Sequence, residues 1–206
     1  MKLENYELHL PSYSVGKEVY NQIGKICKPY GTKVLVIGGK KALSAAFDKI
    51  SKNAADGGLD IIGKEIYGTD CTYEAVERLA ALTSFQEADM VFAVGGGKAI
   101  DTCKCLCIEC EKPMFTFPTI ASNCAACTSV SIMYHEDGTF FKPHFFTHPA
   151  AHAFIITDNR CKCRPHQSEA RTFYKQVIQT DIAESAGQRQ NQSVLRLIIR
   201  RPERHE

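Results

Sequence analysis

The chain has 206 residues, a formal net charge of +2, 44% hydrophobic and 23% charged residues, 10 Cys and no Trp. This composition is ordinary for a globular protein and excludes collagen-like, coiled-coil and wholly disordered chains. No apolar run approaches the roughly 20 residues that span a bilayer, and the polar start of the chain does not resemble a signal peptide. We therefore expect a cytoplasmic protein with reduced thiols, no membrane association and no nucleic-acid partner.

Charge is distributed unevenly along the chain. Residues 1–159 hold 14 Lys, one Arg and 18 acidic residues, a balance of −3, whereas residues 160–206 hold 8 Arg, 2 Lys and 5 acidic residues, a balance of +5. We expect residues 1–159 to form one domain and residues 160–206 to be a basic tail outside its fold. Three interpretations of this tail are open: a basic interaction segment, a disordered extension, or a stretch that does not belong to the fold.

Strands and helices alternate along the first domain. Short apolar runs predict strands over 33–37, 59–67, 90–94 and 114–117. Helical spacing predicts helices over 40–52, 73–85 and 98–111, the second capped by Thr72. This alternation implies βαβ units and a mostly parallel sheet. Further along the chain, 131–134 and 139–141 predict a hairpin, and 153–156 predict a last strand.

The most informative segment is the glycine triplet Gly95–Gly97, which lies between a predicted strand and a predicted helix. Glycines let a ligand approach the backbone closely, and their N–H groups at a helix N-terminus suit a pyrophosphate. The triplet is neither GxGxxG nor a P-loop. Alone, it is more often a tight strand-to-helix turn than a binding site.

Further motifs accompany the triplet, namely GGGKAIDTCK at 95–104, FPTIASN at 117–123 and SVSIMY at 129–134. In this order and spacing they resemble the glycerol dehydrogenase branch of the iron-containing alcohol dehydrogenases, over residues 8–159. The resemblance implies an α/β fold with a Rossmann-like parallel sheet flanked by helices, without the family's C-terminal helical domain. Residues 1–159 would then be the dinucleotide-binding domain, in a family that transfers hydride from a metal-bound alcohol or polyol to NAD.

The resemblance also implies roles for individual residues. The glycine triplet would hold the pyrophosphate, and Lys98 and Asp101 would shape that loop. Thr119 and Ser122 would contact the adenine and phosphate side, and Thr128, Val130 and Tyr134 would line the nicotinamide end. Gly39 lies where several relatives have an acidic residue for the adenosine ribose, so NAD is favoured only slightly over NADP. The implied cofactor residues are Gly39, Gly95, Gly96, Gly97, Lys98, Asp101, Thr119, Ser122, Thr128, Val130 and Tyr134.

The chain departs from the family pattern at the substrate and at the metal. Cys124 stands where glycerol dehydrogenases carry the Asp that orients the polyol, and a thiol cannot reproduce a carboxylate's hydrogen bonds to two hydroxyls, which counts against glycerol. The family's Zn or Fe is held by an Asp beyond this domain and by later histidines, which we expect to be missing here. The catalytic residues therefore stay unknown, and we expect little or no turnover.

Residues 173–180 suggest an explanation for the missing ligands. Their codons can be written so that a shifted frame reads Leu-Gln-Ala-Gly-x-(Ser or Pro)-Asp, which is similar to the family's Asp motif. We hypothesise that the residues from about 160 onward are an out-of-frame translation. The gene sequence tests this, because codons incompatible with the shifted frame would exclude it.

Two other functions remain open beside a dehydrogenase, which would act on a small alcohol and could form a homo-oligomer. One is a non-catalytic nucleotide-binding remnant or regulatory module. The other is a zinc module, since residues 107/110 and 124/127 are two CxxC pairs, but core thiols explain these pairs better. Likewise His144, His148 and His152 have a helical ligand spacing, yet nearby prolines favour surface histidines.

Overall fold

The computed structural model of the protein describes residues 11–120 and 123–157. These residues all belong to the first of two units into which the chain divides, Met1–Lys162 and Cys163–Glu206. The predicted tail, the domain boundary at 159/160 and the motif at 173–180 lie outside the described residues and stay predictions. No helix among the described residues is long and apolar enough to cross a membrane.

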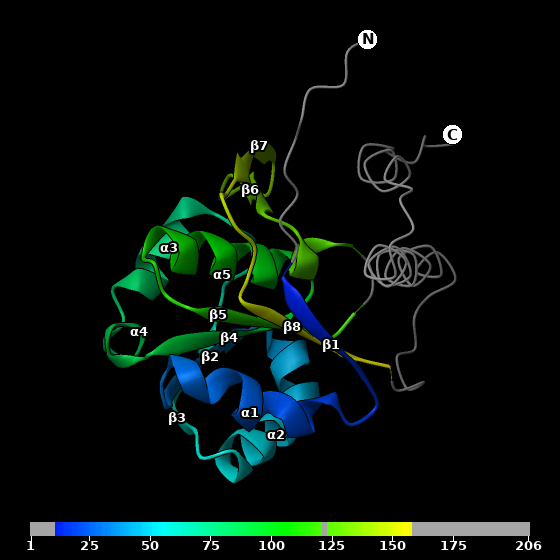
Figure 1. Ribbon diagram of the computed structural model, residues 1–206. Helices are drawn as coiled ribbons and strands as arrows, with labels where there is room; N and C mark the ends of the chain where they lie inside the picture. Colours follow the sequence, from blue (N-terminus) through cyan, green and yellow to red (C-terminus); the bar gives the residue numbers. More distant parts are fainter. Residues whose placement is uncertain (1–10, 121–122, 158–206) are drawn as a thin grey trace. The chain divides into compact units, whose positions relative to one another are not determined.

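A six-stranded, fully parallel sheet forms the centre of the domain (Figure 1). Its strand order is β1-β8-β5-β4-β2-β3. The five strands predicted for this sheet are confirmed, each within a residue or two of its expected ends, whereas β1 was not predicted. The bounds are β1 Ser12–Gly16, β2 Lys33–Gly38, β3 Asp60–Ile66, β4 Met90–Gly95, β5 Met114–Pro118 and β8 His152–Ile156.

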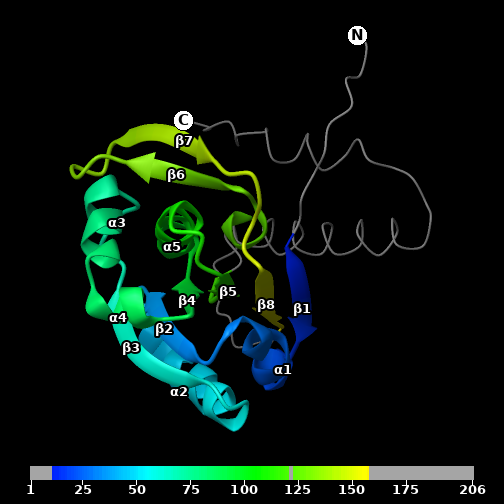
Figure 2. The same cartoon turned by 60° about the vertical axis from the view of Figure 1, so that its left-hand side comes forward.

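Helices cover both faces of this sheet, as expected when βαβ crossovers join parallel strands. α1 (Ile23–Cys27) and α2 (Lys40–Asp56) lie on one face, and α3 (Tyr73–Ala80) and α5 (Gly97–Glu109) lie on the other (Figure 2). Short 3-10 turns at Val19–Gln22, Lys28–Tyr30 and Ala125–Cys127 complete the connections. The predicted Rossmann-like α/β fold is therefore confirmed.

The predicted hairpin is also confirmed. β6 (Val130–Tyr134) pairs antiparallel with β7 (Phe140–Phe145), separately from the main sheet. The hairpin lies across α5, on the side away from the sheet (Figure 2). It therefore makes a third layer over the helix that follows the glycine triplet.

The single helix predicted over 73–85 was wrong, because the chain forms two helices there. α3 ends at Ala80, and α4 (Thr83–Glu87) begins after Leu82, whose backbone is extended. The Gln86 amide donates to the Ala80 carbonyl at 2.7 Å, which satisfies a terminal carbonyl of α3. The break lets Phe85, only 1% exposed, enter the core. The predicted cap is confirmed, since Thr72 Oγ1 accepts the Ala75 N–H at 3.1 Å.

Aromatic side chains from neighbouring strands fill the core beneath the sheet. The Phe117 ring stacks on Phe154 at a centroid distance of 4.8 Å and also contacts Phe92 at 4.8 Å. All three side chains are fully buried. Because they come from β4, β5 and β8, their burial fixes these strands side by side.

His152 contradicts the expectation that the three spaced histidines are surface residues. It lies on β8, is only 7% exposed, and shares a hydrogen bond of 2.9 Å with Ser14 Oγ on β1. Burial lowers its pKa. His148 is exposed, as expected, and His144 lies part-buried on β7.

This burial predicts an acid-sensitive contribution to stability. His152 becomes protonated at about pH 6.5 in the unfolded chain but only at lower pH in the folded protein, so stability is lost as the pH falls below that value. As the pH is lowered from about 7.5 to about 5.5, we expect the free energy of unfolding of wild type to decrease relative to that of His152→Gln. Urea unfolding at each pH measures this, and a constant difference would contradict it.

Candidate functional site

The glycine triplet lies where the strand order of the sheet reverses. From β2 the chain goes to β3 on one side and then returns to β4 on the other, so the loops after β2 and β4 lie next to each other at the carboxyl edge of the sheet. Gly39 follows β2, Gly95 ends β4, and Gly96 and Gly97 begin α5. In open α/β sheets, ligands bind outside the carboxyl ends of the strands at this point.

Close packing requires glycine at the ends of β2 and β4. Gly95 has φ +152°, and a Cβ there would lie 3.0 Å from the Cβ of Ala99 and 3.8 Å from the Gly39 nitrogen. A Cβ on Gly38 would overlap the Val94 carbonyl oxygen. A side chain on Gly38 would therefore push β2 and β4 apart, and a side chain on Gly95 would strain the backbone.

The segment after β5 lies against the other side of the triplet. The Thr119 N–H donates to the Gly95 carbonyl at 3.1 Å. A Cβ on Gly96 would lie 2.8 Å from Ile120 Cδ1, and one on Gly97 would overlap the amide of Asn123. The structure thus brings Thr119 to the glycine loop, while Ser122 lies outside the described residues.

The glycine loop also begins α5, a helix of 13 residues. Gly96 is its N-cap, and no side chain among the described residues caps this end. The first N–H groups of a helix have no intrahelical partner, and the helix dipole favours negative charge there. The loop can therefore accept an anionic group such as a pyrophosphate.

Lys98 connects the glycine loop to Tyr134, which the family motifs imply at the cofactor, and to Asp70, which the sequence analysis did not single out. Its ammonium forms an ion pair with Asp70, in the loop after β3, and lies 5.2 Å from the centre of the Tyr134 ring. The Asp70 carboxylate raises the pKa of Lys98. Asp70 could have been noticed, because loops after parallel strands all meet at one edge of the sheet.

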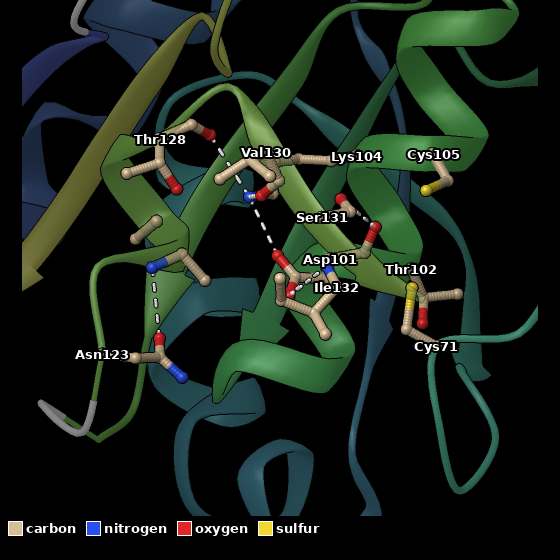
Figure 3. A network of polar contacts seen from close by, with 12 residues as sticks. Cys71, Asp101, Thr102, Lys104, Cys105, Asn123, Thr128, Val130, Ser131 and Ile132 are labelled. Carbon is tan, nitrogen blue, oxygen red and sulfur yellow. Dashed lines mark hydrogen bonds and ion pairs between the residues drawn. The ribbon is translucent and has the colours of Figure 1, made fainter. Parts of the chain in front are cut away.

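Asp101 takes part in a buried ion pair rather than in the loop itself. Its carboxylate is 2.8 Å from the ammonium of Lys104, a residue of α5 whose side chain is fully buried (Figure 3). Burial raises the pKa of Asp101, and the nearby ammonium opposes that shift. The sequence analysis did not single out Lys104, since lysine is rarely buried.

The ion pair also holds the hairpin against α5. Lys104 donates to the carbonyls of Thr128, at 3.2 Å, and of Val130. The other oxygen of Asp101 accepts the Ile132 N–H at 3.3 Å, and Ser131 Oγ donates to the Asp101 carbonyl at 2.9 Å (Figure 3). These bonds position Thr128 and Val130, two of the residues implied at the nicotinamide end.

Cys124 lies half-buried beside Asn123, in the segment that covers the glycine loop. Burial raises the pKa of its thiol, which therefore stays protonated at neutral pH. A protonated thiol is a weak donor and a poor substitute for a carboxylate acceptor.

The remaining cysteines agree with the expectation of core thiols. All eight within the described ranges are free, and most are buried. These residues contain no group of three or more His, Cys, Asp or Glu side chains that could hold a metal ion. The two CxxC pairs therefore do not form a zinc site, and the described residues do not supply the metal ligands of the resembled family.

Comparison with known proteins identifies the family. The family model for iron-containing alcohol dehydrogenases matches residues 11–159, and the chain belongs to this family. It is similar to a glycerol dehydrogenase of Escherichia coli, with 32% identity over 128 residues, 62% of this chain and 35% of that enzyme. It is also 29% identical to a glycerol dehydrogenase of Pseudomonas putida over 74% of this chain and 41% of that enzyme.

The fold is found in solved structures as well. The crystal structure of glycerol dehydrogenase from Schizosaccharomyces pombe superposes with a TM-score of 0.65 at 23% identity, over 75% of this chain and 39% of that one. The chain thus spans about 35 to 41% of the length of these relatives. The resemblance inferred from the motifs is confirmed.

The buried ion pair predicts strongly coupled mutations. Lys104→Met should cost about 3–5 kcal/mol, because it leaves the Asp101 carboxylate buried without its partner. Adding Asp101→Asn should recover part of that loss, and chemical denaturation of the single and double variants measures the coupling.

Lys112 provides the matched control, since its ammonium is bonded to the carbonyls of Phe85 and Ala88. Lys112→Met combined with Asp101→Asn should give additive losses. Additive losses for the Lys104 pair as well would show that no such coupling exists.

Proposed function

We propose that residues 11–157 bind NAD and serve as the cofactor domain of an alcohol or polyol dehydrogenase. The observation that carries this proposal is the glycine loop, which combines the start of α5, the point of strand reversal and a close approach to the loop after β2. Bound NAD would supply the hydride acceptor. The residues of this chain would bind and orient it.

The proposed roles follow the order of the loops at the carboxyl edge of the sheet. Gly95, Gly96 and Gly97 would hold the pyrophosphate, and Gly39 would face the adenosine ribose. Thr119 and Ser122 would lie on the adenine and phosphate side, and the hairpin would place Thr128, Val130 and Tyr134 at the nicotinamide end. Lys98 and Asp101 would hold that hairpin and the glycine loop in place.

Gly39 bears on the choice between NAD and NADP. Gly39 has no carboxylate to accept hydrogen bonds from the ribose hydroxyls or to repel a 2′-phosphate. The preference of the protein for NAD over NADP would therefore be small. A Cβ on Gly39 would lie 3.5 Å from Tyr67 Cε1, which limits what could replace this glycine.

The substrate would be a small alcohol or polyol, as the names of the relatives suggest, with Cys124 near it. Glycerol itself is disfavoured, since a thiol cannot bind two hydroxyls as a carboxylate does. The described residues do not fit a Zn or Fe site, so we assign no step to a metal. A cytoplasmic location agrees with free thiols, and we also propose assembly into a homo-oligomer.

Binding of NADH by the 206-residue chain tests the cofactor role. Gly96 has φ −93°, so a side chain there would not strain the backbone, but its Cβ would lie 2.8 Å from Ile120 Cδ1. Gly96→Val should therefore displace Ile120 and fill the loop, and we expect at least about tenfold weaker NADH binding by titration calorimetry. Gly16→Ala is the matched control, because its Cβ meets nothing within 4 Å. Equal affinities for folded Gly96→Val and wild type would refute the assigned site.

A non-catalytic nucleotide-binding module is the second candidate, favoured by the lack of a metal-ligand cluster among the described residues. Both candidates bind NADH, so alcohol-dependent NAD reduction separates them. Assays with several diols, with and without added Zn²⁺ or Fe²⁺, should show little turnover for this chain. Robust metal-dependent reduction would establish the catalytic role instead.

A further inference from the structure

Three sulfur atoms meet in the core between α5 and the hairpin. Cys71 Sγ lies 3.4 Å from Met133 Sδ, and Cys105 Sγ lies 3.3 Å from the same sulfur. All three side chains are fully buried, each with 0% exposure. The proposed dinucleotide site uses none of them.

The three residues come from separate parts of the fold. Cys71 precedes the cap of α3, Cys105 lies in the middle of α5, and Met133 lies on β6. Figure 3 places Cys71 beside Thr102, on the side of α5 that also carries Cys105. The Tyr134 N–H donates to the Cys71 carbonyl at 2.8 Å, and this hydrogen bond links the segment before α3 to β6.

We propose that Cys71, Cys105 and Met133 form a binding site for a soft monovalent metal ion, Cu(I). Two thiols and a thioether are the ligands that select Cu(I), whereas Zn²⁺ is almost always held by four ligands at structural sites. Cu(I) and two thiolates together carry one net negative charge, so the selectivity of the site would come from the soft sulfur ligands rather than from charge balance.

Binding requires the three sulfurs to move apart. Sulfur ligands about 2.3 Å from a trigonal metal would lie about 4 Å apart, so relative to Met133 Sδ the sulfur of Cys71 would move by about 0.6 Å and that of Cys105 by about 0.7 Å. Each thiol that becomes a ligand gives its proton to solvent, so binding releases protons and weakens at low pH.

Competition with a chromophoric chelator tests the proposal. The reduced 206-residue chain is titrated under argon into the Cu(I) complex of bicinchoninate, and loss of the complex's colour reports transfer. Wild type should take up one more Cu(I) with high affinity than Cys71→Ala or Cys105→Ala. Met133→Leu should weaken that site at least about tenfold, the scale on which partners of metal ligands act.

Cys103→Ala is the matched control, because Cys103 is also fully buried on α5 but is not one of the three ligands. It should retain the wild-type site. Equal uptake by wild type, Cys71→Ala and Cys105→Ala, or an equal loss in Cys103→Ala, would overturn the proposal.

Met133→Leu keeps the test decisive if a cysteine variant fails to fold, since this exchange conserves volume. X-ray absorption of the chain loaded with one equivalent of Cu(I) should show three sulfur neighbours for wild type and two for Met133→Leu. Unchanged coordination and unchanged affinity in the folded Met133→Leu variant would exclude the thioether and the site.

Discussion

The buried ammonium of Lys104 organises the part of the structure that could bind a cofactor. It belongs to a residue of α5, forms an ion pair with Asp101 at 2.8 Å and donates hydrogen bonds to two carbonyls at the start of the hairpin. A buried charge is tolerated only when it is paired and fully hydrogen-bonded, so the helix and hairpin cannot separate without a large cost. The same helix begins at the glycine loop, so α5 joins that loop to the hairpin.

Close packing at the point of strand reversal is the second constraint. Gly38 and Gly95 allow the loops after β2 and β4 to touch, and the Thr119 N–H closes the loop after β5 onto them. The three loops thus meet through their backbones at the glycine triplet. This agrees with a domain that binds and orients a dinucleotide, in a family whose matched relatives extend beyond the matched segments, which cover 35 and 41% of their length.

Much of this fold could be predicted from the sequence, because buried parallel strands are continuous apolar runs, as at 33–37 and 90–94. The family motifs also identified the glycine loop. Pairing of β1 with β8 was missed, since it joins residues about 140 positions apart. The break at Leu82 and the burial of His152 depend on tertiary contacts, and a buried Lys104 contradicts the usual behaviour of lysine.

Hydrogen–deuterium exchange with and without NADH tests the central claim most directly, because it locates the bound dinucleotide on the backbone. The account predicts slower exchange of the amides of Gly95–Ala99 and of the loop after β2 when NADH is present. Unchanged exchange at these amides at saturating NADH, or protection confined to another part of the chain, would contradict it.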